Sequence, residues 1–193
     1  MLSTTFNLAH KANACTSGYK KLAEYLGGIE KYGKDTPIPL TTVLESNGLD
    51  DTIWALRCTI EPSENILIEF TCRCTEHILH FYEDKYPNDK RPRQAIEAAR
   101  RCITDKSPAA RAAAWAAAWA AGAAAGDAAG AAKAAAWAAA GAAWAAAWAA
   151  WAAWAAAWAA AGDAAGDAAG DAAWDAEKQW QQQTFFELLE ARQ

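Results

Sequence analysis

The segment from Ala109 to Lys178 is built almost entirely from three residue types. Of its 70 residues, 45 are alanine, nine are tryptophan and seven are glycine. Alanine has the highest intrinsic helix propensity, and the segment contains no proline and no β-branched residue, so only glycine opposes a helix locally. This restricted composition predicts that the second half of the chain is helical.

The tryptophans of this segment recur with helical spacing. Because a helix turns by about 100° per residue, separations of three, four and seven residues keep the indoles on one side. Glycines lie on the same line of the helix surface, so positions that carry an indole alternate with positions that carry no side chain. We expect each group of indoles to pack against a glycine and alanine groove of a neighbouring helix, which removes about 150–250 Å² per indole from water. The alternative is an exposed ladder that stacks bases or sugars, but the segment lacks the basic groove that such ladders need. The residues on this line are Trp115, Trp119, Gly122, Gly126, Gly130, Trp137, Trp144, Trp148, Trp151, Trp154 and Trp158, with Gly162, Gly166 and Gly170 close to it.

The segment also contains three glycine–aspartate repeats and one long uncharged run. The repeats Gly162-Asp163, Gly166-Asp167 and Gly170-Asp171 fit either a helix with an acidic edge or a break into an antiparallel hairpin. The uncharged run from Ala134 to Gly162 is long enough to span a bilayer, yet it contains no Leu, Ile, Val or Phe. Since alanine contributes little to membrane insertion, we expect no membrane helix.

The beginning of the chain predicts short helices joined by turns, and no part of it alternates as a strand. Ser17 is a candidate N-cap for a helix that stops at Gly33. Thr42 and Glu45 have the spacing of a capping box, for a short helix ended by Asn47-Gly48.

A longer amphipathic helix is expected over residues 64–85, followed by a turn and a helix with Pro92 in its first turn. Ser107-Pro108 is a cap followed by a proline, which predicts the start of the alanine-rich helices. The predicted fold is therefore all-α, with alanine-, tryptophan- and glycine-rich helices packed antiparallel. We divide the chain into residues 1–107 and 108–193, which together form one domain. The residues expected to face the core are Leu67, Phe70, Cys74, Ile78 and Phe81 on the longer helix and Ala95, Ile96, Ala99 and Ile103 on the next.

Charge is distributed unevenly along the chain. Residues 1–111 carry 15 basic and 15 acidic side chains, whereas residues 112–193 carry 3 and 8, so the whole formal charge of −5 lies in the second part. An acidic tail argues against binding to a phosphate backbone and favours a basic protein partner. The five cysteines are odd in number and form no CxxC pair, and the N-terminus has no apolar stretch like a secretory signal, so we expect reduced thiols in the cytoplasm.

Four potential metal ligands lie within nine residues. Cys74 and His77 are one helical turn apart and His80 extends the same edge, while Cys72 lies two residues earlier. A zinc ion would need a further ligand such as Cys102 or Glu76, and nothing in the spacing requires one. We favour the other interpretation, in which the cysteines are small core residues and the histidines lie on the helix surface, and we expect no metal.

The charged sequence Asn88-Asp89-Lys90-Arg91-Pro92-Arg93 is the most specific local pattern. Two arginines beside the positive end of a helix could bind an anion. The structural alternative, which we favour, is that Asp89 neutralises one arginine while the other pairs with Glu76 or Glu83 on the preceding helix.

The run from Cys74 to Arg100, which contains this turn, resembles the central motif of a family of immunity proteins found in bacterial polymorphic-toxin loci and in phage genomes. Ala14-Cys15 and the stretch from Pro39 to Cys58 resemble its N-terminal part, and an alanine-rich segment with tryptophan also follows the motif in such proteins. The resemblance implies an all-α cytoplasmic protein that neutralises a toxin by binding it. It brings no catalytic residues.

Two functional hypotheses follow from these observations, with an enzyme as a third that no polar constellation supports. The first is a non-enzymatic protein that occludes a toxin with a preformed helical surface, helped by the acidic residues Asp163, Asp167 and Asp171. The alternative is a phage-encoded protein that sequesters a small anionic, nucleotide-derived signalling molecule through arginine and tryptophan. A homo-oligomer is compatible with both, and no cofactor or nucleic acid is expected. The candidate binding residues are Glu76, His77, Asp89, Arg91, Arg93 and Arg100.

Overall fold

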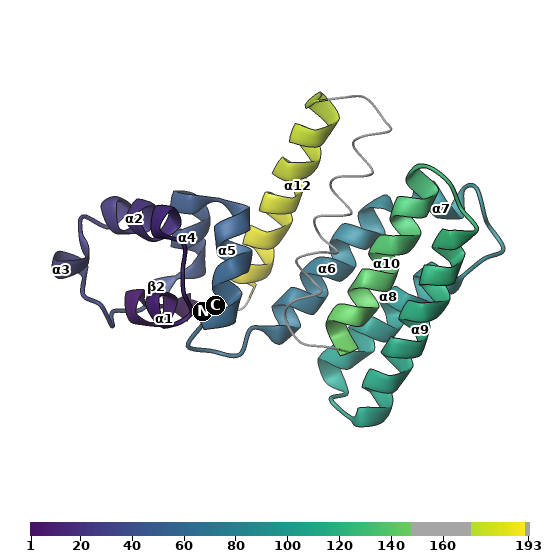
Figure 1. The fold of residues 1–193 in the computed structure, drawn as a ribbon, viewed down its shortest axis with the longest axis horizontal. Coiled ribbons are helices and arrows are strands. Elements are labelled where there is room, and N and C mark those ends of the chain that lie inside the picture. The colour runs from purple at the N-terminus through teal and green to yellow at the C-terminus, as the bar shows by residue number, and fades with distance from the viewer. Residues whose placement is uncertain (148–170, 192–193) are drawn as a thin grey trace. The chain divides into compact units, whose positions relative to one another are not determined.

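A computed structural model describes residues 1–147 and 171–191 of the chain. The fold is all-α, as predicted, and within the described residues the helices are accompanied by one small two-stranded sheet (Figure 1). The chain forms two compact units, one of residues Met1–Ile66 with Gln181–Gln193 and one of residues Leu67–Trp180. The predicted division between residues 107 and 108 falls inside the second unit.

The first unit is a set of short helices around a small sheet. Strand β1 (Ser3–Thr4) pairs antiparallel with β2 (Ile38–Pro39), and the hydroxyl of Thr4 donates to the carbonyl of Cys58 at 2.6 Å. Phe6, Ile38 and Leu40 form its fully buried centre. Its helices are α1 (Phe6–Lys11), α2 (Thr16–Tyr25), α3 (Ile29–Tyr32), α4 (Leu40–Asn47), α5 (Leu49–Ala55) and the 3₁₀ turn η1 (Leu56–Cys58), together with the second half of α12 (Asp171–Glu190).

Some of the predicted helix ends in this unit are wrong. Cys15, and not Ser17, caps α2, because its Sγ accepts the backbone N–H of Gly18 at 3.4 Å. The helix stops at Tyr25, since Gly27 and Gly28 adopt positive φ angles of 77° and 101°. The structure likewise starts α4 at Leu40, which rules out a capping box at Thr42, whereas the predicted end at Gly48 is confirmed.

The second unit contains longer helices. These are α6 (Glu64–Ile78, from Leu67 onward), α7 (His80–Glu83), α8 (Arg91–Thr104), α9 (Pro108–Gly126), α10 (Ala131–Ala147) and the first half of α12. The single helix predicted over residues 64–85 is broken at Leu79, whose N–H bonds to the carbonyl of Glu76 three residues earlier. The predicted helix starts are confirmed at Pro92 and at Ser107, whose hydroxyl accepts the N–H of Ala110 at 3.2 Å.

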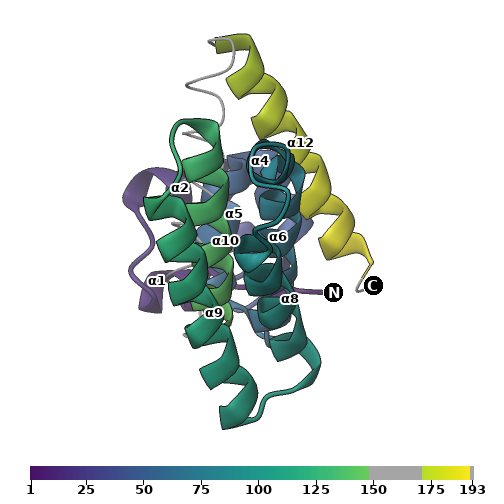
Figure 2. The same cartoon turned by 90° about the vertical axis from the view of Figure 1, so that its right-hand side faces the viewer.

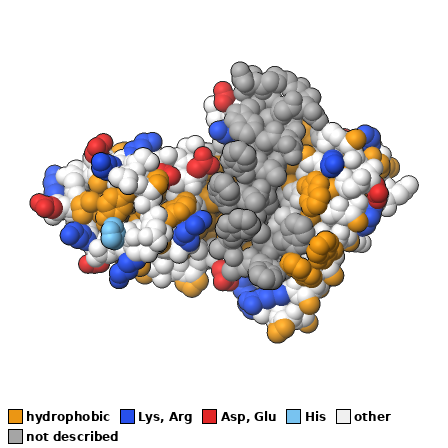
Figure 3. All heavy atoms as spheres, in the orientation of Figure 1, with side chains coloured by type: hydrophobic (Ala, Val, Ile, Leu, Met, Phe, Trp, Pro, Cys, Tyr) orange, Lys and Arg blue, Asp and Glu red, His pale blue; other side chains and the backbone are white. Residues whose placement is uncertain are grey.

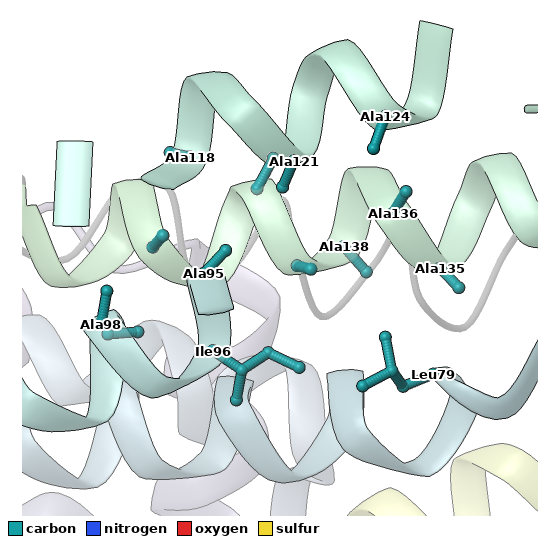
Figure 4. Close-up of a cluster of buried hydrophobic side chains, with 14 of the residues drawn as sticks. Leu79, Ala95, Ile96, Ala98, Ala118, Ala121, Ala124, Ala135, Ala136 and Ala138 are labelled. Carbon is teal, nitrogen blue, oxygen red and sulfur yellow. The ribbon is translucent and has the colours of Figure 1, made fainter. Parts of the chain in front are cut away.

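Alanine side chains fill the centre of this unit. Helices α9 and α10 form an antiparallel hairpin and lie side by side in both views, and α8 contacts both helices (Figures 1 and 2). Figure 4 shows methyl groups of the facing helices pointing at one another, with Ile96 and Leu79 as the larger of the labelled side chains. The alanines that are 0% exposed are Ala95, Ala99, Ala114, Ala118, Ala121, Ala124, Ala125, Ala135, Ala136, Ala138, Ala139, Ala140, Ala142 and Ala143.

The three tryptophans of the hairpin whose side chains are described lie at its edges, and only one of them is seen to make the expected contact with a glycine groove. Trp115, Trp119 and Trp137 are 39%, 60% and 42% exposed. One predicted contact does form, because the ring of Trp137 lies 3.7 Å from the position that a Cβ would occupy at Gly122. Helices that meet through methyl groups leave no room for an indole between them. The side chain of Trp144 and residues 148–170, with the remaining tryptophans of the stripe and the glycine–aspartate repeats up to Gly170, lie outside this description.

The alanine core makes a specific prediction about side-chain size. Replacing Ala121 with leucine forces three extra carbon atoms into a closely packed layer, which costs about 1–3 kcal/mol or more of unfolding free energy. The matched control is Ala113→Leu at an exposed position of the same helix, where little change is expected. Urea denaturation followed by circular dichroism measures both, and equal stabilities of the two variants would contradict the packing described here.

Candidate binding surface

The turn between α7 and α8 is held by a carboxylate with several donors. Asp89 accepts hydrogen bonds from the backbone N–H of Arg91 at 3.0 Å, from the Arg91 guanidinium at 2.6 and 3.0 Å, and from the Tyr82 hydroxyl at 2.6 Å. The Arg91 guanidinium holds the pKa of Asp89 well below its usual range. Burial, together with the Asp89 carboxylate, raises the pKa of Tyr82 to about 12. Arg91 also contacts Asp127 at 3.4 Å.

The second arginine of the turn has its own carboxylate. Arg93 forms a two-pronged ion pair with Glu83, whose pKa it lowers. The favoured interpretation of the charged turn is thus confirmed, because Asp89 holds Arg91 while Glu83 holds Arg93. An anion at this turn would have to displace a carboxylate from either guanidinium. The structure therefore does not support sequestration of a small anionic molecule by these arginines.

A third arginine joins α8 to α6. The guanidinium of Arg100 donates to Glu76 at 2.7 and 2.9 Å and to Glu69 at 3.0 Å, and Glu69 also accepts from Arg73 at 3.0 Å. Hydrogen bonding to Glu76 is the main reason why the pKa of Arg100 is raised. These two helices are thus linked by a network of charge-assisted hydrogen bonds, which are stronger than neutral ones.

His77 connects α6 to the first half of α12. Its ring stacks on the indole of Trp180 with 3.9 Å between the centroids and 16° between the planes. Its Nε2 lies 3.3 Å from a carboxylate oxygen of Glu177. About a hundred residues separate His77 from these two partners in sequence, so no local pattern could have revealed the contact.

We call the side chains of these ion pairs and of the histidine stack the charged surface. All six candidate residues of the sequence belong to it. Sequence reasoning missed Glu69, Arg73, Tyr82, Asp127, Glu177 and Trp180, of which only the helical i,i+4 spacing of Glu69 and Arg73 carried a signal. The charged surface comprises Glu69, Arg73, Glu76, His77, Tyr82, Glu83, Asp89, Arg91, Arg93, Arg100, Asp127, Glu177 and Trp180.

The cysteines near this surface behave as core residues. Cys72, Cys74 and Cys102 are buried, and burial raises the pKa of the Cys72 thiol to about 12 and raises the pKa of the other two thiols as well. The thiol of Cys72 points to the backbone carbonyl of Ile96 at 3.8 Å. Within residues 1–147 and 171–191, no three His, Cys, Asp or Glu side chains are grouped so that they could hold a metal ion.

The acidic tail lies largely outside the described residues. Asp163 and Asp167 belong to residues 148–170, and of Asp171 only the backbone, at the start of α12, is described. None of the described helices combines the length and the hydropathy that crossing a bilayer requires. The run from Ala134 to Gly162 includes residues that lie outside the described helices.

The charged surface thus consists of ion pairs that join α8 to α6, to α7 and to the turn before α8. A family model for "Imm-5 like putative immunity protein" matches residues 58–187, which include α6, α8, α9, α10 and most of α12. The chain therefore belongs to this Imm-5 like immunity protein family, as the resemblance of its central motif indicated. Neither the curated proteins nor the solved structures yield a match to the chain.

The Asp89 cluster predicts how stability depends on pH. Because the pKa of Asp89 is depressed in the folded state, its stabilisation is complete above the ordinary aspartate pKa of about 4 and is lost as the pH falls below it. Asp89→Asn should lower the unfolding free energy at neutral pH by about 1–2 kcal/mol, since the cluster is only partly exposed to water. It should also flatten the decline in stability between about pH 5 and pH 2.

The matched control is Asp84→Asn, which makes the same charge change at an exposed position. Urea denaturation of the three proteins across this pH range measures the effect. If Asp89→Asn and the wild type declined in parallel, the cluster would not carry the assigned stabilisation.

Proposed function

We propose that this chain is a non-enzymatic immunity protein that neutralises a cognate toxin by binding it directly. The observation that carries the proposal is the family match over residues 58–187, a range that contains the whole charged surface. The toxin, in this proposal, contacts that surface, and the binding residues are Glu76, His77, Asp89, Arg91, Arg93 and Arg100.

The ion pairs suit this role because they fix the side chains before a partner arrives. Immobilising a long side chain on binding costs about 0.5–1.5 kcal/mol, and an arginine already held by a carboxylate avoids much of that cost. Arg93, Arg73 and His77 nevertheless keep 44%, 41% and 42% of their side-chain area exposed. The surface thus offers fixed charges of both signs, which favour a partner with a complementary charge pattern.

The acidic second part of the chain supports a basic partner. It carries 3 basic and 8 acidic side chains over residues 112–193. Unlike the paired charges of the charged surface, such an excess acts at a distance and speeds the encounter with a positively charged protein. We assign this role to Asp163, Asp167 and Asp171.

Contact through the charged surface is tested with Arg93→Ala. This variant should weaken binding of a catalytically inactivated toxin that the wild type neutralises by about tenfold or more, as expected for an arginine at the centre of an interface. Arg93→Lys should recover only part of the loss, because a lysine cannot reproduce the two-pronged geometry.

The control is Lys20→Ala, which removes the same charge from an exposed position of the first unit. Isothermal titration calorimetry measures binding, and rescue of growth on co-expression with the active toxin reports neutralisation. Equal affinities of Arg93→Ala and Lys20→Ala would exclude Arg93 from the interface, and failure of the wild type to rescue growth would refute the function.

Electrostatic steering by the acidic tail is tested through rates. Replacing Asp163, Asp167 and Asp171 with lysine should lower the association rate constant at low salt and leave the dissociation rate constant nearly unchanged. The difference should disappear at high ionic strength, because exposed charges are screened over about 10 Å at 0.1 M salt. Stopped-flow kinetics with the inactivated toxin measures both constants, and an unaltered association rate at low salt would remove the tail from the mechanism.

A further inference from the structure

The contact between α6 and the first half of α12 contains a side chain whose charge changes near neutral pH. His77 of α6 stacks on Trp180, and its Nε2 lies 3.3 Å from a carboxylate oxygen of Glu177. All three residues belong to the second unit. We propose that this contact is a pH-sensitive latch, which holds the first half of α12 more firmly on α6 when His77 is protonated. The inference is independent of the proposed toxin binding.

Both partners of His77 bind the charged ring better than the neutral ring. An imidazolium over the face of an indole gains a cation–π attraction that a neutral imidazole lacks. Its Nε2–H then donates to the carboxylate of Glu177, and a hydrogen bond between charged groups is about twice as strong as a neutral one. The His77 side chain is 42% exposed, so it can exchange protons with the solvent. The hold on α12 is therefore complete at acidic pH and weakens as the pH rises through the range in which histidine loses its charge.

The surroundings of Glu177 make the contact sensitive to the charge on His77. The Glu177 side chain is only 12% exposed. It also lies close enough to the buried thiol of Cys74 on α6 to act on it, because burial raises the pKa of Cys74 and the Glu177 carboxylate raises it further. Charges in such a place are screened less by water and salt than those of an exposed ion pair.

The charged neighbours of His77 on its own helix already have partners. Arg73 lies one turn before His77 and pairs with Glu69 at 3.0 Å. Glu76, the residue before His77, pairs with Arg100 at 2.7 Å. Carboxylates and guanidinium groups keep their charge between about pH 5 and 8, so these ion pairs do not change where histidine titrates.

Two other elements present titratable or charged groups near the contact. On α7, His80 directs its Nδ1 to the backbone carbonyl oxygen of His77 at 3.0 Å, and it is the second histidine that titrates in this range. On α12, Asp175 and Lys178 are exposed, and helix geometry places each of them about 100° or more around the axis from Glu177. Glu177 is thus the charged side chain of α12 that faces His77 among the described residues.

Hydrogen–deuterium exchange of the full chain, measured by mass spectrometry at about pH 5.5 and about pH 8, tests the latch without any toxin. The protection of residues 175–180, corrected for the intrinsic pH dependence of amide exchange, should fall by about threefold to tenfold from the lower to the higher pH. Amides of α10 are the internal reference and should keep their protection. The Asp89 cluster does not contribute, because it titrates at lower pH.

Four variants assign the effect to one histidine. His77→Phe keeps an aromatic ring for the stack but cannot be protonated, so protection should no longer depend on pH. Glu177→Gln removes the carboxylate and should reduce the dependence. His80→Gln and His10→Gln are the matched controls and should behave as the wild type does. His10, the only histidine of the first unit, is exposed, and Figure 3 shows a histidine side chain at the surface over that unit.

Three outcomes would overturn the latch. The first is equal protection of residues 175–180 at both pH values in the wild type. The second is a pH dependence that persists in His77→Phe. The third is a dependence that disappears in His80→Gln, which places the sensor at His80. Circular dichroism verifies that each variant is folded. Should His77→Phe fail to fold, Glu177→Gln decides in its place, because a dependence of wild-type size in that variant would contradict the proposal.

Discussion

Methyl groups of α8, α9 and α10 meet at the centre of the second unit, and the positions of the other groups follow from that contact. An alanine face allows two helices to approach closely. Dispersion contacts between their backbones therefore take the place of the contacts that larger side chains make in an ordinary core. Polar side chains of α6 can then reach the main chain of their neighbours, as Thr75 does at the carbonyl of Ala138 and Cys72 at that of Ile96. Bulky residues are displaced to the edges, where Trp115 and Trp119 lie.

The charged surface shows a second consequence of close helix packing. Helices α6 and α8 lie near enough for Arg100 to hold Glu69 and Glu76 at once, and the short turn before α8 is closed by Asp89. The arginines of this face already have carboxylate partners, so under the proposed function a toxin would meet a fixed pattern of charges and not unsatisfied groups. In that proposal the face would discriminate through complementarity, since a wrong partner places like charges together.

Sequence reasoning succeeded where the responsible atoms are close together in the chain. Pro92 and Ser107 were identified as helix starts, and the pairing of Asp89 and Glu83 with the two arginines follows from the geometry of one turn. It failed where two nearby side chains compete to cap the same helix, as Cys15 and Ser17 do at the start of α2. It also failed at the strands, because two residues are too few to show an alternating hydrophobic pattern. It could not find the stacking of His77 on Trp180, which depends on the tertiary fold.

For Trp115 and Trp119 the expected burial against a neighbouring helix was wrong, and the cause is physical. The tryptophan stripe suggested a buried face because indoles are large and apolar. Yet the other sides of α9 are alanine, which is also apolar, so hydrophobic periodicity does not distinguish a tryptophan face from an alanine face. The narrow space between the helices determines which face of α9 is buried, because it accepts methyl groups and excludes indoles.

The alanine centre also restricts how the gene for this chain can change. A single base change in an alanine codon yields Gly, Ser, Thr, Val, Pro, Asp or Glu. Proline breaks the helix, the acidic residues bring a charge into an apolar layer, and threonine and valine are too wide for it. Only glycine and serine fit within the space of a methyl group or nearly so. At the fully buried positions of this layer, therefore, only the smallest residues can take the place of alanine.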